Sequence, residues 1–259
     1  MRFSYLIFSF SLVFCQLEQP FPPLDLVSIP TAGTLPKGSY TYETKLSKDG
    51  SVLPQLSLGL TQNLTLGVSY GIHHLIGDDK PEFNPQVGFQ IKYRLYDETI
   101  TMPAFLIGLN TQGRGKFTKL IEDFSDTLTV NRYDQKALGF YLVTSKNWSL
   151  FGNLGLHMGL SKNLWEISDG DQDFNIFFGF DKEINRSFSI LMEYDAALND
   201  NDYDLRELSF GKGKGYINMA IRWAIVSNIL LELNFNDLSQ NTEALYTNRE
   251  IKIMYSESF

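Results

Sequence analysis

Large apolar side chains occupy every second position along much of this chain. Residues 56–72 read LSLGLTQNLTLGVSYGI, and large apolar residues alternate with serine, glycine and threonine on both sides of TQN. A period of two is typical of a β-strand whose faces meet different surroundings, because successive side chains point to opposite faces. The stretch therefore predicts two strands joined by a tight turn.

The same period recurs along the chain and predicts twelve strands, whereas no segment of comparable length has apolar residues at helical spacing. The predicted strands lie near residues 38–47, 51–60, 64–74, 86–97, 101–110, 135–145, 147–160, 173–181, 186–196, 214–224, 228–236 and 248–259.

The connections between these strands alternate in length. TQN, DET, SKN, KEIN and VS are short, and only the first connection on the other side, SKDG, is also short. The long polar links are 75–85, 111–134, 161–172, 197–213 and 237–247. Short periplasmic turns and longer extracellular loops are typical of outer-membrane barrels. We predict an all-β fold, a closed antiparallel transmembrane β-barrel of about 12 strands.

The two faces of the predicted strands differ consistently. One face carries mostly large apolar residues, with aromatic residues near strand ends at Trp148, Tyr194, Trp223 and Tyr255. Such a face suits lipid between two aromatic girdles, and the small, polar and charged opposite face suits a lumen. A water-soluble exported β-protein, with the apolar face packed in a core, is the main alternative.

The composition excludes one class of partner. The 259 residues carry a formal net charge of −8, and the isoelectric point is about 4.9. An acidic chain is repelled by phosphate backbones, so we expect no nucleic-acid partner.

The first fifteen residues read MRFSYLIFSFSLVFC and predict a signal peptide over 1–15. Arg2 precedes an apolar run that is too short for a membrane anchor and suits a secretory signal. Cleavage near Gln16, lipidation at Cys15 and an uncleaved segment remain alternatives. Cys15 is the only cysteine in the sequence, so no internal disulfide is possible.

Residues 16–37 hold five of the nine prolines. Proline lacks the amide hydrogen that a sheet ladder needs, so we predict an extended N-terminal segment there. The barrel is predicted to occupy 38–259.

The chain ends REIKIMYSESF, with Ile251, Ile253, Tyr255 and Phe259 on one face. This ending resembles the C-terminal strand signal of bacterial outer-membrane proteins, although Glu257 stands where that signal has an apolar residue. The resemblance implies a bacterial outer-membrane location. It also implies contact of Phe259 with the barrel assembly machinery, in a membrane of lipid and lipopolysaccharide.

A second, looser resemblance covers residues 29–74. IPTAGTLPKGSY followed by GLTQNLTLGVSYG is similar to the N-terminal part of uncharacterised YjbH-like barrels, a group linked to exopolysaccharide export. The resemblance implies the fold and the location and identifies no functional residue.

Strand alternation directs a set of polar and charged side chains toward the lumen, where they form either a solute-selecting constriction or a salt-bridge network that braces the wall. The candidate lumen-lining residues are Gln90, Lys92, Arg94, His157, Glu193, Asp195, Arg222, Glu232 and Lys252. Asn153, Asn218, Asn234 and Glu250 share this inward phase.

Catalytic chemistry has weak support in the sequence. A barrel phospholipase needs a Ser–His pair at the lipid-facing wall, whereas His157 is predicted to face the lumen. His74 with Asp78 or Asp79 is the candidate pair for a protease-like site near the outer rim. We predict no enzyme and no catalytic residue.

Two acidic stretches, 169–173 and 199–204, could suggest calcium. The EF-hand order fails, because Phe174 and Leu205 stand where glycine is required. A divalent ion that bridges these loops to lipopolysaccharide remains an alternative to solvated loops. We predict no metal-binding residue, no cofactor-binding residue and no cofactor.

The sequence thus favours a passive narrow channel for small solutes. The alternative is a non-conducting structural or envelope/polysaccharide-export accessory barrel, whose lumen is plugged by its own side chains or by the 111–134 loop. An outer-membrane hydrolase is the third hypothesis. No oligomeric state is predicted.

Overall fold

The computed structural model describes residues 23–122, 127–200, 211–242 and 248–259. The predicted signal peptide and Cys15 lie outside the described residues. Within these ranges the only helices are two short 3-10 turns, η1 (Lys48–Gly50) and η2 (Leu198–Asp200). No helix in the described residues is long and apolar enough to cross a membrane.

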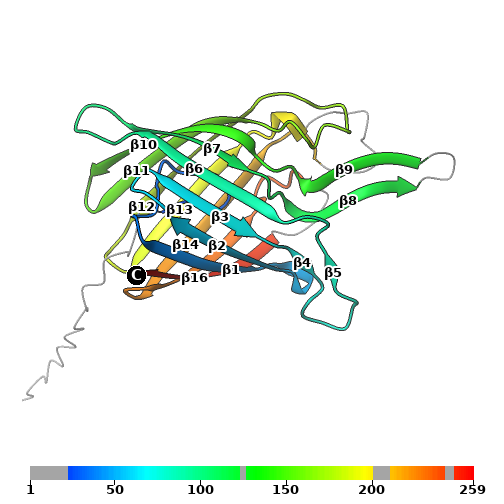
Figure 1. Ribbon diagram of the computed structural model, residues 1–259, viewed down its shortest axis with the longest axis horizontal. Helices are drawn as coiled ribbons and strands as arrows, with labels where there is room; N and C mark the ends of the chain where they lie inside the picture. The colour runs from blue at the N-terminus through cyan, green and yellow to red at the C-terminus, as the bar shows by residue number, and fades with distance from the viewer. Residues whose placement is uncertain (1–22, 123–126, 201–210, 243–247) are drawn as a thin grey trace, which may run out of the picture.

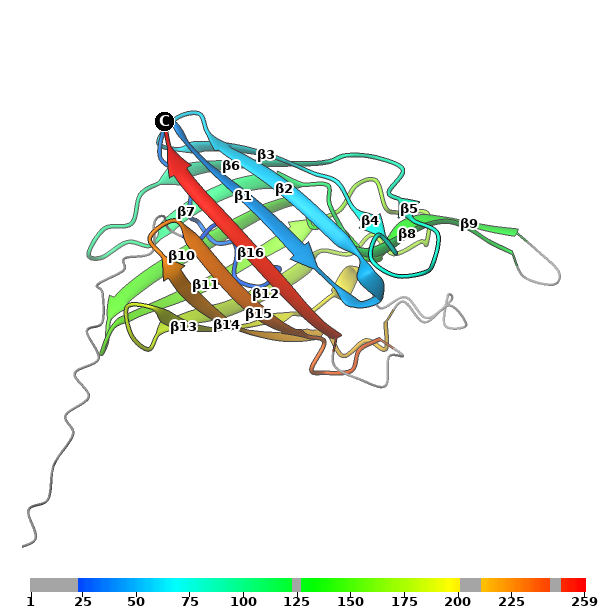
Figure 2. The ribbon, with the colours of Figure 1, turned by 90° about the horizontal axis from the view of Figure 1, so that it is seen from below.

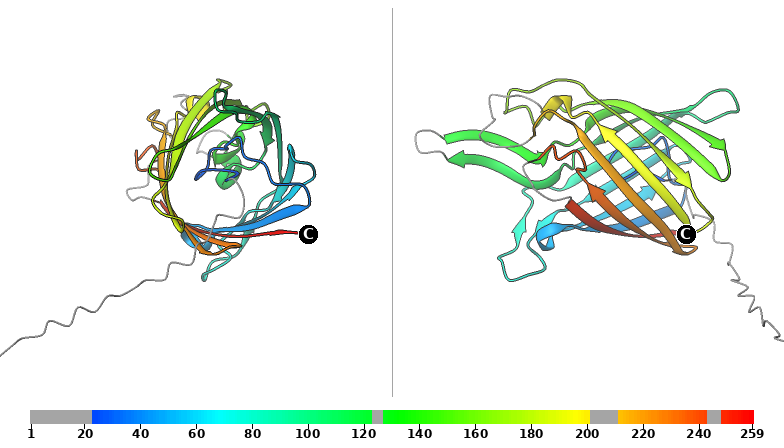
Figure 3. Two further views of the ribbon diagram at one scale, coloured as in Figure 1. Left: turned by 90° about the vertical axis from the view of Figure 1, so that its left-hand side faces the viewer. Right: turned by 180° about the vertical axis from the view of Figure 1, so that it is seen from behind.

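Twelve antiparallel strands form one closed barrel, because β1 pairs with both β16 and β2. Figure 2 shows β1 lying between these two neighbours, and Figure 3 shows the ring from one end. The strands are β1 (Ser39–Leu46), β2 (Val52–Gly59), β3 (Leu64–Ser69), β6 (Gly88–Tyr96), β7 (Ala104–Asn110), β10 (Gly139–Ser149), β11 (Asn153–Lys162), β12 (Asn175–Glu183), β13 (Phe188–Asp195), β14 (Tyr216–Val226), β15 (Ile229–Asn236) and β16 (Asn248–Ser258). The predicted fold class is confirmed.

The connection between β10 and β11 differs from the prediction. The predicted turn SKN lies inside β10, which continues to Ser149. The chain turns instead at Phe151 and Gly152, which have φ angles of 45° and 95°. Glycine adopts positive φ without steric cost, so Gly152 marks the turn more strongly than the asparagine used for the prediction.

Two further strand pairs extend the long-loop end of the barrel, of which only β8–β9 forms a sheet of its own. β4 (Ile72–His73) pairs with β5 (Glu82–Phe83), and β8 (Arg114–Glu122) pairs with β9 (Thr127–Gln135). Figure 1 shows that the β8–β9 hairpin projects away from the barrel. The 111–134 segment is therefore mostly a protruding hairpin, and only its base reaches the outer end of the lumen, where Arg114 pairs with Glu250.

The outer face of the barrel is apolar. Alternate residues of neighbouring strands are large, apolar and partly exposed, as along β3 and β6. Examples are Leu66, Val68, Phe89, Ile91 and Tyr93. A closed barrel leaves no unpaired strand edge, so such a face can meet hydrocarbon.

The hydrophobic core lies inside the barrel and is built around the chain that precedes β1. We call residues 23–37 the plug segment; it is the dark blue chain inside the ring in Figure 3. The segment makes a tight turn in which the Leu26 amide donates to the Ile29 carbonyl at 2.9 Å. Leu26, Val27 and Ile29 are all 0% exposed.

Candidate functional site: the lumen and its plug segment

The tip of the plug segment is held by one carboxylate. β13 alternates so that Glu193 points inward, where its Oε2 accepts hydrogen bonds from the amides of Val27 at 2.9 Å and Ile29 at 3.2 Å. The Ser28 amide donates to Glu193 Oε1 at 3.0 Å, and the Ser28 hydroxyl also donates to that oxygen. Asn218 Nδ2 donates to Oε1 at 2.7 Å. The buried charge is therefore well satisfied, as hydrogen bonds to charged groups are stronger than neutral ones.

Two cationic side chains bind residues 24–26, which lead into the turn of the plug segment. Lys92 Nζ lies 3.4 Å from Asp25 Oδ1 and also donates to the Leu24 carbonyl. Arg222 Nη2 donates to the carbonyls of Asp25 at 3.2 Å and Leu26 at 3.4 Å. Of the predicted lumen-lining residues, Glu193, Lys92 and Arg222 therefore contact the plug segment rather than open water.

Small inward residues fix the rest of the segment. The Ala32 amide donates to Ser145 Oγ at 2.8 Å, and the Leu35 amide donates to Thr65 Oγ1 at 2.8 Å. A Cβ atom at Gly179 would lie 2.6 Å from Leu26 Cδ1, so glycine is needed for the close approach there. The inner wall is thus shaped to the segment.

A buried ion network lies beside the plug segment. Glu232 accepts from Arg222 Nε at 2.7 Å and lies 2.8 Å from Lys252 Nζ. Glu232 and Lys252 are 0% and 1% exposed. The salt-bridge network expected as one of the two alternatives is therefore present for these residues.

The other predicted lumen-lining residues make separate contacts. His157 lies 2.7 Å from Ser145 Oγ and 2.8 Å from Asp181 Oδ1. Elsewhere on the inner wall, Gln90 bonds to Gln55, Asp195 bonds to Asn175, and Arg94 pairs with Asp97 beside a short turn. All nine predicted residues lie on the inner face, but the structure does not gather them into one constriction.

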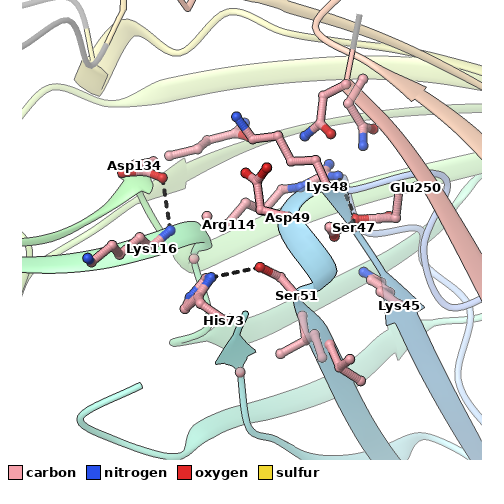
Figure 4. A pocket seen from close by; sticks show the side chains of 18 of the residues that line it. Lys45, Ser47, Lys48, Asp49, Ser51, His73, Arg114, Lys116, Asp134 and Glu250 are labelled. Carbon is pink, nitrogen blue, oxygen red and sulfur yellow. Dashed lines mark hydrogen bonds and ion pairs between the residues drawn. The ribbon is translucent and has the colours of Figure 1, made fainter. Parts of the chain in front are cut away.

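A cavity of about 490 Å³ lies above the plug segment, at the long-loop end of the lumen. We call it the outer vestibule. Lys45, Lys48, Arg114, His73 and Glu250 are among its lining residues, and Figure 4 shows their side chains around the same space.

The outer vestibule and the tip of the plug segment share one contact residue, Asn218. Arg114 Nη2 lies 3.4 Å from Glu250 Oε2 on the vestibule wall. Asn218 also lines the cavity, and its Nδ2 lies 3.3 Å from Ser28 Oγ. Asn218 therefore joins the wall of the outer vestibule to the plug tip.

The base of the β8–β9 hairpin is fixed by buried charges. Arg132 Nη1 lies 2.7 Å from Asp169 Oδ2, which also lies 2.6 Å from Lys136 Nζ. Arg132 pairs with Asp200 as well. The contacts join the hairpin to two long loops, so sequence stretches that suggested calcium are used, at Asp169 and Asp200, for ion pairs.

Burial raises the pKa of Asp200 from its ordinary value of 3.8 to about 7, although Arg132 and Lys136 act in the opposite direction. The folded protein therefore binds this proton more tightly than the unfolded chain does. The contribution of Asp200 to folding stability is largest below the ordinary value and declines as the pH rises through about 7.

We expect Arg132→Ala to loosen the hairpin without opening the barrel. Removing one partner of a buried ion pair costs roughly 3–5 kcal/mol, here confined to the hairpin and its neighbouring loops. Limited proteolysis with chymotrypsin in liposomes should cut the hairpin at least about tenfold faster. Arg186→Ala, in an exposed short turn, is the matched control and should leave the rate unchanged. Equal rates for both variants would show that the ion pairs do not hold the hairpin.

The residues proposed for a protease-like site and for a metal site lie in the long loops. His74 Nδ1 lies 3.7 Å from Asp79 Oδ2, and Asp79 is 84% exposed, in the loop beyond β4. Residues 201–204 of the second acidic stretch lie outside the described residues. Across the described ranges, no group of three or more His, Cys, Asp or Glu side chains could hold a metal ion.

The closed barrel, apolar outside and largely polar inside, defines the class. The chain is a transmembrane β-barrel of the outer-membrane type. No protein-family model and no curated protein sequence matches it.

Solved structures of outer-membrane barrels resemble the fold. One is a KdgM porin in complex with disordered oligogalacturonate, with a TM-score of 0.50 and 11% identity over 85% of this chain and 99% of that chain. A KdgM porin and a NanC porin, 11% and 9% identical, each cover 85% of this chain and 99% of their own, with TM-scores of 0.49 and 0.42. At identities of 9–11% the likeness concerns the fold alone. The resemblance to YjbH-like barrels stays a prediction.

Proposed function

We propose that the protein is a solute channel of the bacterial outer membrane that its own plug segment holds closed. The observation that carries this proposal is the burial of the inward side chains around the segment. Lys92, His157, Arg222 and Lys252 are between 1% and 5% exposed. An open, water-filled pore would leave such side chains accessible, so conduction requires the segment to move.

The contacts of the segment are of a kind that can be broken and remade. In the described part of the chain, no backbone ladder joins residues 23–37 to a barrel strand. Side chains such as Glu193 and Ser145 hold it instead. The barrel can therefore keep its own hydrogen-bond ladder while the segment leaves, as a gate requires.

The second candidate function is a non-conducting structural or export-accessory barrel. The burial of Leu26, Val27 and Ile29 against an apolar wall favours it, because withdrawal would expose this surface to water at roughly 25 cal/mol per Å². Under either function we propose contact with lipopolysaccharide and insertion by the barrel assembly machinery through Phe259. Neither function assigns a catalytic role.

A reversible disulfide between the plug segment and the barrel distinguishes the gated channel from the non-conducting barrel. The variant Ser28→Cys/Asn218→Cys, made with Cys15→Ser, is designed to form a disulfide between the plug segment and β14. The two thiols replace a hydroxyl and an amide group whose Oγ and Nδ2 atoms lie 3.3 Å apart. We expect the oxidised protein in a planar bilayer to stay silent and the reduced protein to show discrete openings. Discrete openings in the oxidised protein would contradict gating by the segment. Silence of both the oxidised and the reduced protein would favour the non-conducting barrel.

A further inference from the structure

The inner wall around the plug segment has two chemically different halves. One half is mainly apolar and comes from β7, β10, β12, β13 and β14; its buried apolar side chains are Leu106, Tyr141, Val143, Phe177, Leu191 and Ala220, and buried Glu193 and His157 lie among the same strands. The other half is charged and comes mainly from β1, β6, β14, β15 and β16; it carries Glu43, Lys92, Arg222, Glu232 and Lys252.

The apolar half is unexpected for a channel that carries hydrophilic solutes alone. Leu106, Val143, Phe177 and Leu191 are each 0% exposed, although strand alternation places them on the inner face. Exposing apolar side chains to the water of an open pore costs free energy, because apolar surface is more stable against other apolar groups than against water. Their presence indicates that the lumen normally holds something apolar.

The plug segment itself has the matching chemistry. Leu26, Val27 and Ile29 pack in the same cluster as the apolar half. Asp25, in the same turn, lies with its carboxylate 3.4 Å from Lys92 Nζ on the charged half. Hydrocarbon and a carboxylate thus sit side by side in the lumen, each held by a different part of the inner wall.

We propose that the lumen, once the plug segment moves, takes small amphipathic carboxylates in place of the segment. The hydrocarbon part replaces Leu26, Val27 and Ile29 on the apolar half, and the carboxylate replaces that of Asp25 at Lys92. This inference rests on the proposed gated channel and names its substrate class. Arg222 contributes less to binding of the carboxylate, because its Nε already donates a hydrogen bond to Glu232 Oε2 at 2.7 Å.

Block of current through the plug-deleted barrel, lacking residues 23–36, tests the proposal. Hexanoate has a short hydrocarbon chain and a carboxylate, and gluconate has the carboxylate with hydroxyls instead. We expect hexanoate to reach half-block at a concentration about tenfold or more below that of gluconate, because its chain leaves water on the apolar half. Equal half-block by the two anions would overturn the proposal while leaving the channel intact.

Matched variants locate the site on the inner wall. Phe177→Ser should raise the half-blocking concentration of hexanoate toward that of gluconate. Phe178→Ser changes the next residue, which is 53% exposed on the outer face, and should leave it unchanged. Lys92→Gln should weaken block by both anions, with Lys119→Gln on the protruding hairpin as its control. A Phe177→Ser variant that blocks like the parent would contradict the assignment.

A second measurement uses the full chain and needs no conduction. In Ser28→Cys with Cys15→Ser, a water-soluble maleimide should label Cys at position 28 slowly, because the tip is held by Glu193. Hexanoate should speed labelling several-fold by competing with the segment, and gluconate should not. Absence of this difference would overturn the proposal even where the deletion variant fails to fold or to conduct, whereas a folded, silent deletion variant would contradict the channel itself.

Discussion

Deleting residues 23–36 is expected to convert a closed barrel into a conducting one. The segment lies inside the lumen, where Leu26 and Val27 are 0% exposed, yet it contributes no strand to the barrel. Its removal leaves the ladder of twelve strands intact and opens the lumen between the outer vestibule and the short-turn end. Single-channel recording in planar bilayers should show large, long-lived steps from the variant and only rare, brief steps from the parent protein.

The matched control removes a similar length of chain from outside the lumen. Joining residue 118 to residue 131 shortens the β8–β9 hairpin, which projects away from the barrel. This variant should conduct no more than the parent protein. If the plug deletion is correctly folded by its heat-modifiable mobility and yet stays silent, the side chains of the barrel close the lumen without the segment and the non-conducting function is correct.

Glu232→Ala is expected to be the most destabilising single substitution in the lumen. The carboxylate is the shared partner of Arg222 at 2.7 Å and Lys252 at 2.8 Å, and it is 0% exposed. Its loss leaves two buried cations side by side, and breaking a buried pair in this way costs roughly 3–5 kcal/mol. Guanidinium unfolding in lipid vesicles should show this loss as a lower transition midpoint.

A matched carboxylate and an apolar replacement test the physical reason. Glu257→Ala removes an exposed carboxylate from the end of the same sheet region and should shift the midpoint little. Glu232→Met combined with Lys252→Met removes both charges of one pair and should recover part of the loss, because apolar groups of similar volume replace buried ion pairs well. If the double variant is worse than Glu232→Ala, the ion pair is not the cause.

Strand alternation was sufficient to predict the barrel and the inward phase of its polar residues. The period is a direct consequence of strand geometry, so positions such as Glu193 and Glu232 could be assigned to the inner face without any distant contact. The structure also places the apolar side chains of Leu106 and Phe177 inward, and alternation alone does not say what an inward apolar residue meets.

The plug segment could not be found this way. Residues 23–37 have no regular period, and their proline content predicted extended chain. Their position depends on contacts distant in sequence, such as that between Val27 and Glu193, which are 166 residues apart. The apolar run LDLVSI at 24–29 was the one available signal, since an apolar stretch between prolines is unusual for chain left in water.

The position of the plug segment also constrains the order of assembly. Its apolar partners come from β7 through β14, and its anchor Glu193 stands on β13, so the surface that receives it exists only after most of the barrel has formed. Contacts so distant in sequence form late, because the entropy of closing long loops must be overcome first. The first described part of the chain to be synthesised is thus the last to reach its place, and during assembly its leucine and isoleucine side chains need shelter from the aqueous periplasm.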